Sequence, residues 1–174
     1  MAEETSKAMK ALEELRQDSK LCKDRHFAAA ERKFSYHVWF GVPVVIANVF
    51  IGSVLVELLK KPNPETWITV TASLLSFLAA SLSGVQTFLN FHKAAEGHRS
   101  VANKYLEISR KCKHLLLKQK DDPVPITDLW SKIEEITQAY SEVNITAEAF
   151  PTSDSDFKKA KAKIMQSVTP VETS

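Results

Sequence analysis

The sequence contains few glycines and few cysteines: 4 Gly and 2 Cys in 174 residues. With so few glycines, no glycine-rich phosphate-binding loop is present. The two cysteines, Cys22 and Cys112, show neither CxxC nor metal-ligand spacing, so we expect reduced, buried thiols in preference to a disulfide or a lipidated cysteine. The 7 prolines leave long stretches free of helix breakers, which favours an all-α fold.

An excess of charge of either sign is also absent, because 23 Lys and Arg face 21 Asp and Glu. A net charge of +2 gives no indication of a nucleic-acid partner. The histidines form no HxxxH or His-carboxylate spacing, and no Ser/His/Asp set can be assigned. We therefore expect no catalytic site, no metal site and no cofactor. Each histidine is instead expected at a membrane interface or as a hydrogen-bonding residue of a helical bundle: His26, His37, His92, His98 and His114.

Two stretches of the chain, Val38–Val56 and Thr66–Phe91, contain no charged residue. About 20 residues of helix cross a bilayer core of about 30 Å, and helices satisfy their own backbone polar groups in hydrocarbon. We predict transmembrane helices over residues 38–59 and 66–91, joined by an external turn at residues 60–65. Such a pair forms a tight antiparallel hairpin with both chain ends on the same side of the membrane.

The distribution of basic residues predicts the orientation of this hairpin. Basic residues near the membrane ends are more numerous before the first span and after the second than in the turn between them, so both termini are predicted to be cytoplasmic by the positive-inside rule. No cleavable signal precedes residue 38, and the first span is expected to act as an uncleaved signal anchor.

Residues outside the spans show the apolar spacing of packed helices. We predict an amphipathic helix over residues 1–37, an extension of the second span over 92–119 that forms one rod with it, and a packing helix over 125–150. Residues 151–174 are predicted to be disordered, although Phe157 to Met165 could form a helix on a partner. The predicted fold is all-α: a two-transmembrane helical hairpin with long helices extending into a cytoplasmic helical bundle.

The core positions expected in these three helices follow from their stripes. They are Ala8, Leu12, Leu15, Cys22 and Ala29, then Ala94, His98, Val101, Tyr105, Ile108, Cys112 and Leu115, then Ile126, Trp130, Ile133, Ile136 or Thr137, Tyr140, Val143, Ala147 and Phe150.

Polar and small side chains inside the two spans are the candidate functional residues. Asn48 lies near the middle of the first span, where it is either a pore or gate residue or an interhelical hydrogen bonder in an oligomer. The second span carries a stripe of small or hydroxylated residues that we call the hydroxyl stripe: Thr69, Ser73, Ser76, Ala80, Ser83, Thr87 and Asn90. This stripe is suited to close helix packing or to lining a narrow path for water. The stretches Val38–Val56 and Thr66–Phe91 contain no charge, so strong ion selection by a charged ring is not expected.

The segment from Gln86 to Arg110 carries a recognisable pattern, TFLNF…A..HR..A..Y..L.R, with Ile108 in place of the usual leucine. It resembles the SLATT family of two-transmembrane proteins, and the QTFLNF form resembles the fungal-type branch of that family. The resemblance covers Arg32 to Leu117. Gly97, just before the His-Arg pair, replaces a helix-favouring residue and would soften the helix there. The residues that carry the pattern are Phe88, Asn90, His98, Arg99, Tyr105 and Arg110.

The resemblance implies a membrane effector that forms pores, in bacteria often beside nucleotide-signal immune systems, where activation damages the membrane. Two spans per chain cannot enclose a path, so the expected partners are other copies of the chain and the lipid bilayer. Because no fused sensor domain is recognisable, we expect the trigger to come from an unidentified partner or from the flanks of the spans. Arg99 is expected to bind lipid headgroups or a neighbouring subunit's carboxylate such as Glu31, or to act as an ordinary interfacial cation. The alternative function is a non-conducting membrane hairpin that acts as a scaffold or recruits partners.

Overall fold

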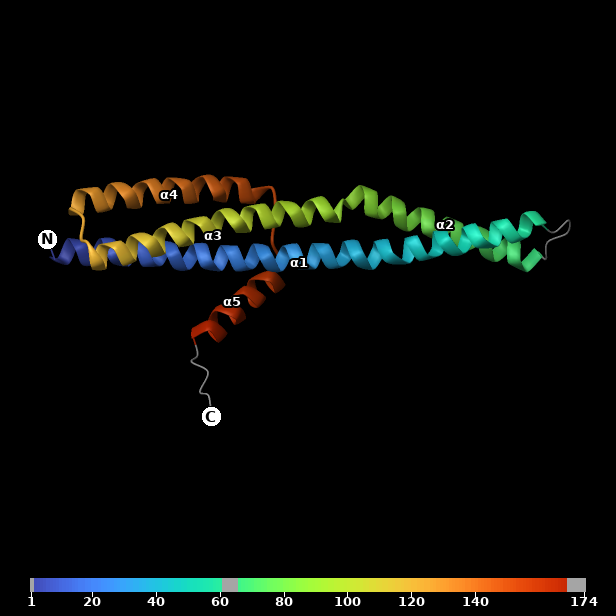
Figure 1. The fold of residues 1–174 in the computed structure, drawn as a ribbon, viewed down its shortest axis with the longest axis horizontal. Coiled ribbons are helices and arrows are strands. Elements are labelled where there is room, and N and C mark those ends of the chain that lie inside the picture. Colours follow the sequence, from blue (N-terminus) through green and yellow to red (C-terminus); the bar gives the residue numbers. More distant parts are fainter. Residues whose placement is uncertain (1, 61–65, 169–174) are drawn as a thin grey trace, which may run out of the picture. The chain divides into compact units, whose positions relative to one another are not determined.

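The computed structural model describes residues 2–60 and 66–168, and its helices follow one another without a strand in that part of the chain. They are α1 (Ala2–Lys60), α2 (Thr66–Leu89), α3 (Phe91–Asp121), α4 (Ile126–Glu148) and α5 (Asp154–Val168) (Figure 1). The chain divides into a bundle unit, Met1–Glu31 with Ala95–Ser174, and a hairpin unit, Arg32–Ala94. The all-α prediction is confirmed.

Helix α1 is a single helix that includes both the predicted amphipathic segment and the predicted first span. Glu3 and Glu4 lie in its first turn, where carboxylates interact favourably with the positive end of the helix dipole. Pro43 lies inside the helix and does not end it. A proline removes one backbone hydrogen bond, and transmembrane helices commonly tolerate this loss.

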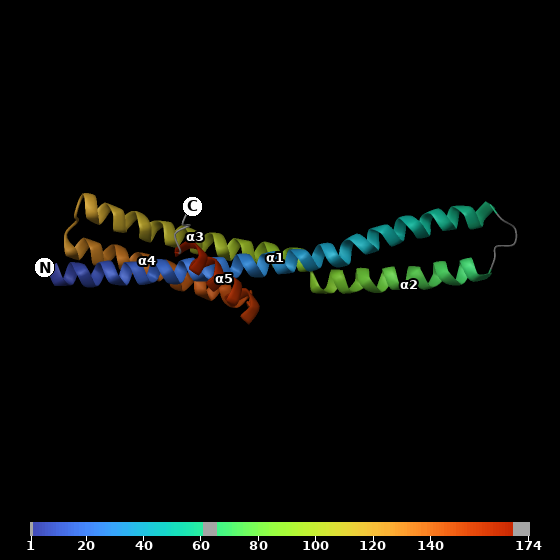
Figure 2. The same ribbon diagram turned by 90° about the horizontal axis from the view of Figure 1, so that it is seen from below.

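In the hairpin unit, α2 runs antiparallel beside the second half of α1 (Figure 2). The contact between them is narrow: Val44, Ile51 and Ala79 are the buried apolar side chains of the two spans. Both helices are long and apolar enough to cross a membrane, yet only 6% of the most apolar window of each is buried. A core helix of a soluble protein would be mostly buried, so these exposed apolar surfaces suit contact with lipid. Of the predicted turn at residues 60–65, Lys60 is the last residue of α1, and residues 61–65 lie outside the described residues.

The prediction that the second span and its extension form one rod is wrong. Helix α2 ends at Leu89 and α3 begins at Phe91, because Asn90 adopts a left-handed backbone conformation with a φ of 41°. Asparagine is one of the few non-glycine residues that tolerates this region. Its side-chain Oδ1 accepts a hydrogen bond from the Lys93 N–H at 3.3 Å, so Asn90 also caps the start of α3.

The bundle unit packs α1, α3 and α4 around one apolar core (Figures 1 and 2). Most of the predicted stripe residues lie in it, but Trp130 does not, because its side chain is 43% exposed. Leu129 takes its place and is fully buried; positions three and four residues after Ile126 both face the same side of a helix, and the spacing alone did not choose between them. The buried core residues are Ala8, Leu12, Val101, Tyr105, Ile108, Cys112, Leu115, Leu129, Ile133, Ile136 and Val143.

Gln119 closes the turn between α3 and α4. Its side-chain Oε1 accepts a hydrogen bond from the Val124 N–H at 3.1 Å, and its Nε2 donates to the Val124 carbonyl at 3.3 Å. This clamp fixes the antiparallel return of α4 beside α3.

The prediction of a disordered carboxy-terminal segment is wrong for residues 154–168, which form α5. Ser153 and Asp156 form a capping box: the Asp156 Oδ2 accepts hydrogen bonds from the Ser153 N–H and hydroxyl, each at 2.8 Å, and the Ser153 Oγ accepts from the Asp156 N–H at 3.4 Å. Asp156 and Ala160 are almost completely buried, so α5 packs on its own chain. Residues 169–174 of the predicted tail lie outside the described residues.

Candidate functional site

The hydroxyl stripe lies mainly outside the contact between α1 and α2. Ser76 is half-buried, and the other members are exposed in the single chain: Thr69, Ser73, Ala80, Ser83, Thr87 and Asn90. The side chains of α2 that pack towards α1 instead centre on the buried Ala79. The stripe therefore does not hold this hairpin together. If its role is close helix packing, that packing is between hairpins of separate chains.

Three hydroxyl groups of the stripe are satisfied by their own helix. Ser73 donates to the Thr69 carbonyl at 2.9 Å, Ser76 to the Ala72 carbonyl at 2.8 Å, and Thr87 to the Ser83 carbonyl at 2.9 Å. Bonding to the carbonyl four residues earlier lets serine and threonine lie in an apolar medium without an unpaired donor. Each hydroxyl oxygen still has lone pairs that can accept a hydrogen bond from water or another chain.

Asn48 presents a different situation, since its side chain is exposed on the hairpin. Within residues 2–60 and 66–168, the side-chain amide of Asn48 forms no hydrogen bond. An unpaired amide in hydrocarbon costs on the order of a few kcal/mol of free energy. A partner for Asn48 must come from another chain or from water.

Asn48 and the hydroxyl stripe lie on the same lateral face of the hairpin. Asn48 borders the α1 contact face, one residue after Ala47 and four after Val44, while the stripe lies roughly a quarter turn from the α2 contact face. Viewed along its own chain direction, each helix carries its polar residues rotated to the same hand from the residues that face the other helix. Because the two helices are antiparallel and face each other, Asn48 and the stripe therefore lie on the same side of the hairpin. We call this side, Asn48 plus the hydroxyl stripe, the polar face of the hairpin.

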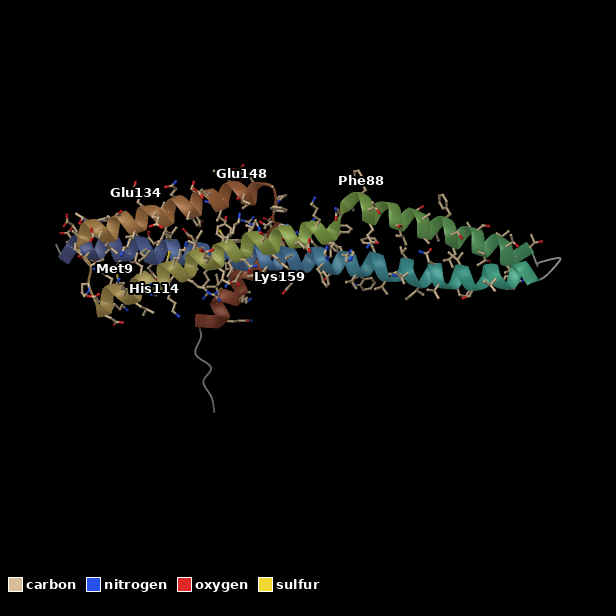
Figure 3. All side chains as sticks on the ribbon, turned by 45° about the horizontal axis from the view of Figure 1, so that its top comes forward. Met9, Phe88, His114, Glu134, Glu148 and Lys159 are labelled. Carbon is tan, nitrogen blue, oxygen red and sulfur yellow. The ribbon has the colours of Figure 1, made fainter. Side chains whose placement is uncertain are left out.

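The far side of α2 is different in character. Phe88 is 87% exposed and points away from α1 (Figure 3). It belongs to a set of large exposed apolar side chains on α2: Val70, Leu74, Phe77, Leu78, Val85, Phe88 and Leu89. Such a surface suits contact with lipid, whereas the polar face carries only small or polar side chains.

Gln86 lies within the hairpin contact. Its Nε2 donates to the His37 Nδ1 at 3.1 Å, and the His37 ring meets the His92 ring edge-on with centroids 5.3 Å apart. Gly41 makes room for this amide, because a Cβ at that position would lie 3.0 Å from the Gln86 Nε2. The spacing of the sequence gave no signal for the pairing of Gln86 with His37.

Two of the family-pattern residues lie in the core of the bundle unit. The His98 Nδ1 lies 3.1 Å from the His26 Nδ1, and both rings are buried. The Tyr105 hydroxyl donates to the Asn144 Oδ1 at 2.6 Å, and burial raises the pKa of Tyr105 to about 12. Arg99 and Arg110, by contrast, are exposed. The pattern thus contains core residues as well as surface residues.

Gly97 has a packing role that the sequence did not reveal, and its softening of the helix stays a prediction. A Cβ on Gly97 would lie 1.9 Å from the Phe150 Cε1, so the missing side chain lets the Phe150 ring rest directly on α3. The same ring lies 5.7 Å from the His98 ring. Gly97 therefore serves close packing at the end of α4.

Both cysteines are free, as the sequence analysis predicts. Burial raises the pKa of Cys112 to about 11, and burial also raises that of Cys22, whose sulfur lies 3.8 Å from the Tyr140 hydroxyl. Neither thiol is activated as a nucleophile. In the described part of the chain, no three His, Cys, Asp or Glu side chains are grouped as a metal site would require.

The exposed apolar spans and the polar face define a two-span membrane hairpin attached to a helical bundle. The family model for the SMODS and SLOG-associating 2TM effector domain, family 4, matches residues 22–170, and the chain belongs to this family. No match was found among curated proteins or among solved structures. The family assignment confirms the resemblance seen in the sequence and extends it through α5; the fungal-type branch stays a prediction.

Proposed function

We propose that several copies of this membrane effector assemble through the polar faces of their hairpins and enclose a pore. The observation that carries this proposal is the position of the hydroxyl stripe: it is exposed in the single chain and is not used in the contact between α1 and α2. A hairpin of two helices cannot surround a path by itself, so the pore requires a homo-oligomer.

The unpartnered amide of Asn48 supports assembly. It lies on the same face as the stripe, within the charge-free stretch Val38–Val56. Pairing with the polar face of a neighbouring copy would satisfy this amide, at a typical gain of about 0.6 kcal/mol per interhelical hydrogen bond. The small side chains beside it allow close approach of the neighbouring helix.

The length of the stripe favours a pore over simple packing. Thr69 and Asn90 lie at its two ends, and a helix rises about 1.5 Å per residue, so the stripe is about 30 Å long and matches the hydrocarbon core. Its hydroxyls offer lone pairs to water along that whole length. Because no ionisable side chain lies in the stretches Val38–Val56 and Thr66–Phe91, we expect weak selectivity between ions.

We further propose that both termini, and so the bundle unit, face the cytoplasm, as the distribution of basic residues indicates. On this orientation an activating partner would act on the bundle unit. The helix break at Asn90 lies between α2 and α3, so a movement of α3 would act on the second span at this residue.

Ion flux across liposomes that contain the purified protein tests the pore, with the particle mass measured in detergent. We expect a discrete conductance from an oligomer, altered by Ser83→Leu because leucine fills the polar face. Ser81→Leu is the matched control: Ser81 is an exposed serine of the same helix, and its hydroxyl donates to the Phe77 carbonyl at 2.9 Å, but it lies on nearly the opposite side of α2 from Ser83.

Equal effects of the two substitutions would show that the polar face does not line the path. A stable oligomer that gives no ion flux across liposomes would favour the scaffold alternative, provided that the protein also gives no flux when a dimerisation domain is fused to its amino terminus. A monomer in detergent and in nanodiscs would contradict the pore and leave the hairpin that recruits partners.

A further inference from the structure

Helix α5 packs on the bundle with a face that does not coincide with its apolar face. Asp156 and Ala160 are the side chains it buries, with exposures of 0% and 1%. Phe157 and Met165 are 39% and 64% exposed, although they are the largest apolar side chains of the helix. Helical spacing places Phe157, Ile164 and Met165 along one side, rotated away from the buried face. The docked position therefore covers only part of the apolar side of α5.

Two contacts of α5 with α1 lie partly at the surface. The Lys163 Nζ lies 3.4 Å from the Oδ1 of the buried Asp24, but the lysine side chain is 71% exposed, and Asp24 is also paired with the Lys23 Nζ at 3.2 Å. The Arg25 guanidinium lies over the Phe157 ring, 5.8 Å from its centroid, and such a cation–π contact contributes about 1 kcal/mol or less at an exposed site. No side chain of α5 belongs to the apolar core of the described residues, so α5 can leave the bundle without unfolding that core.

The solvent-facing side of α5 is strongly basic. Lys158, Lys159 and Lys161 are exposed and form no ion pair within the described part of the chain, and Lys163 follows on the same helix. Lys159 is labelled in Figure 3. Lys161 lies on the apolar side, four residues from both Phe157 and Met165, and the other three lysines lie away from it. Four lysines in six residues on a helix with a phenylalanine and a methionine on one side are typical of helices that lie on anionic membranes.

The groove beside α5 continues this chemistry onto α1. Its apolar lining comes from Leu21 together with Phe157, Ile164 and Met165, and its cationic lining from Arg16, Lys20 and Lys161. Asp18 is its acidic lining residue. A groove lined by both apolar and cationic side chains complements an anionic headgroup next to an acyl chain.

We propose that α5 is a membrane-binding arm, which exchanges its docked position on the bundle for the surface of an anionic bilayer. In the bound position Phe157, Ile164 and Met165 enter the acyl boundary and the lysines contact lipid phosphates. The required membrane is the one in which the spans of the same chain lie, and the bilayer is favoured over an acidic protein segment because the arm carries its own apolar side. This inference depends on the membrane location of the family and does not require the pore.

Lipid-dependent quenching of a dye on α5 tests the proposal in the full-length protein. A fluorophore is attached to Met165→Cys, and the background labelling of Cys22 and Cys112, whose thiols are largely buried, is subtracted with the unsubstituted chain. The protein is reconstituted in vesicles of phosphatidylcholine alone or of phosphatidylcholine with phosphatidylglycerol, each containing a doxyl-labelled lipid. We expect strong quenching only with phosphatidylglycerol, and less of it at high salt.

Matched charge variants distinguish lipid binding by α5 from a general effect of charge. Lys158→Gln, Lys159→Gln and Lys161→Gln together should shift the equilibrium towards the docked position roughly a hundredfold and abolish the quenching. Lys104→Gln, Lys113→Gln and Lys118→Gln, exposed positions on α3, remove the same charge and should leave it unchanged. Absence of quenching in the anionic vesicles, or an equal loss in both triple variants, would overturn the proposal and leave the groove to an acidic protein segment. Conductance is not part of this measurement, so its result is independent of the pore.

Discussion

The Nδ1 atoms of His26 and His98 lie 3.1 Å apart in the bundle core, although 72 residues separate the two histidines in sequence. At this distance one Nδ1 donates a proton and the other accepts it, so the pair holds a single proton between two neutral rings. A second proton would place two N–H groups face to face in a buried space. The pair therefore links α1 to α3 as long as one of the two Nδ1 atoms lacks a proton, and each added proton places a charge in a buried space.

This arrangement predicts that acid weakens the bundle. Burial, then the charges of His98 and Arg25, lowers the pKa of His26 from 6.5 to about 4, with Asp156 opposing the shift. The unfolded chain binds a proton on this histidine between those two values and the folded chain does not, so stability is complete above pH 6.5 and falls as the pH drops towards 4. We expect a loss of about 2 kcal/mol between pH 7 and pH 5, measured by denaturant unfolding in detergent.

A matched pair of substitutions assigns this pH dependence. Glutamine at His26 can still hydrogen-bond the His98 ring but does not titrate, so His26→Gln should flatten the profile over this range. His114→Gln, at an exposed position on α3, should preserve it. An unchanged slope in His26→Gln would show that other groups cause the acid sensitivity.

Gly97 and Phe150 predict an unusual response to alanine. In the middle of a helix, glycine to alanine normally stabilises by about 1 kcal/mol. At Gly97 the new Cβ would collide with the Phe150 ring, so Gly97→Ala should instead destabilise the bundle by about 1–3 kcal/mol. The free energy of unfolding in detergent measures this effect.

Two further variants isolate the collision. Combining Gly97→Ala with Phe150→Leu should recover part of the loss, giving a positive coupling in a double-mutant cycle. Gly84→Ala, where no atom lies within 4 Å of the new Cβ, should not destabilise the monomer. A neutral Gly97→Ala would mean that the Phe150 ring moves aside freely.

Asp156 predicts how firmly α5 is folded. Asp156→Ala removes the acceptor of two hydrogen bonds from Ser153 and should cost α5 about 1–2 kcal/mol. Trypsin should then cleave at the α5 lysines roughly 5–30 times faster, because cleavage follows the population of the open form. Asp154→Ala, an exposed carboxylate in the same first turn, should change the rate far less. Equal rates in the two variants would show that the capping box does not hold α5.

The helical periodicity of the sequence predicted most of the fold. The stripes of α1 and α3 were correct because charged and apolar residues alternate clearly there: Ala8 and Leu12 on one helix and Val101 and Tyr105 on the other are buried as expected. The two stretches without charged residues were sufficient to predict the two helices of the hairpin. These features depend on average chemistry along a helix, which the sequence displays directly.

Features that depend on one residue or one contact could not be predicted. The break at Asn90 replaces a continued apolar pattern, and only its left-handed φ and cap distinguish it from a helical residue. The segment of α5 has a polar composition, and its order comes from the capping box and from packing on α1. The histidine pair joins positions whose local spacing carries no signal. For the polar face, the sequence identified the residues, but their exposure required the structure.

The break between α2 and α3 gives the last prediction. Asn90→Gly keeps a residue that accepts the left-handed φ of 41° and loses only the cap to Lys93, so it should cost a few tenths of a kcal/mol. Asn90→Ala loses the cap and meets the steric penalty of that φ, for a total of about 2 kcal/mol in the hairpin, unless α2 and α3 straighten into one helix. Unfolding in detergent gives the energies, and spin labels on exposed sites either side of residue 90 detect straightening. Asn103→Ala, on the exposed surface of α3, should be neutral or slightly stabilising. If Asn90→Ala matches Asn103→Ala in both stability and label distances, the break does not depend on asparagine.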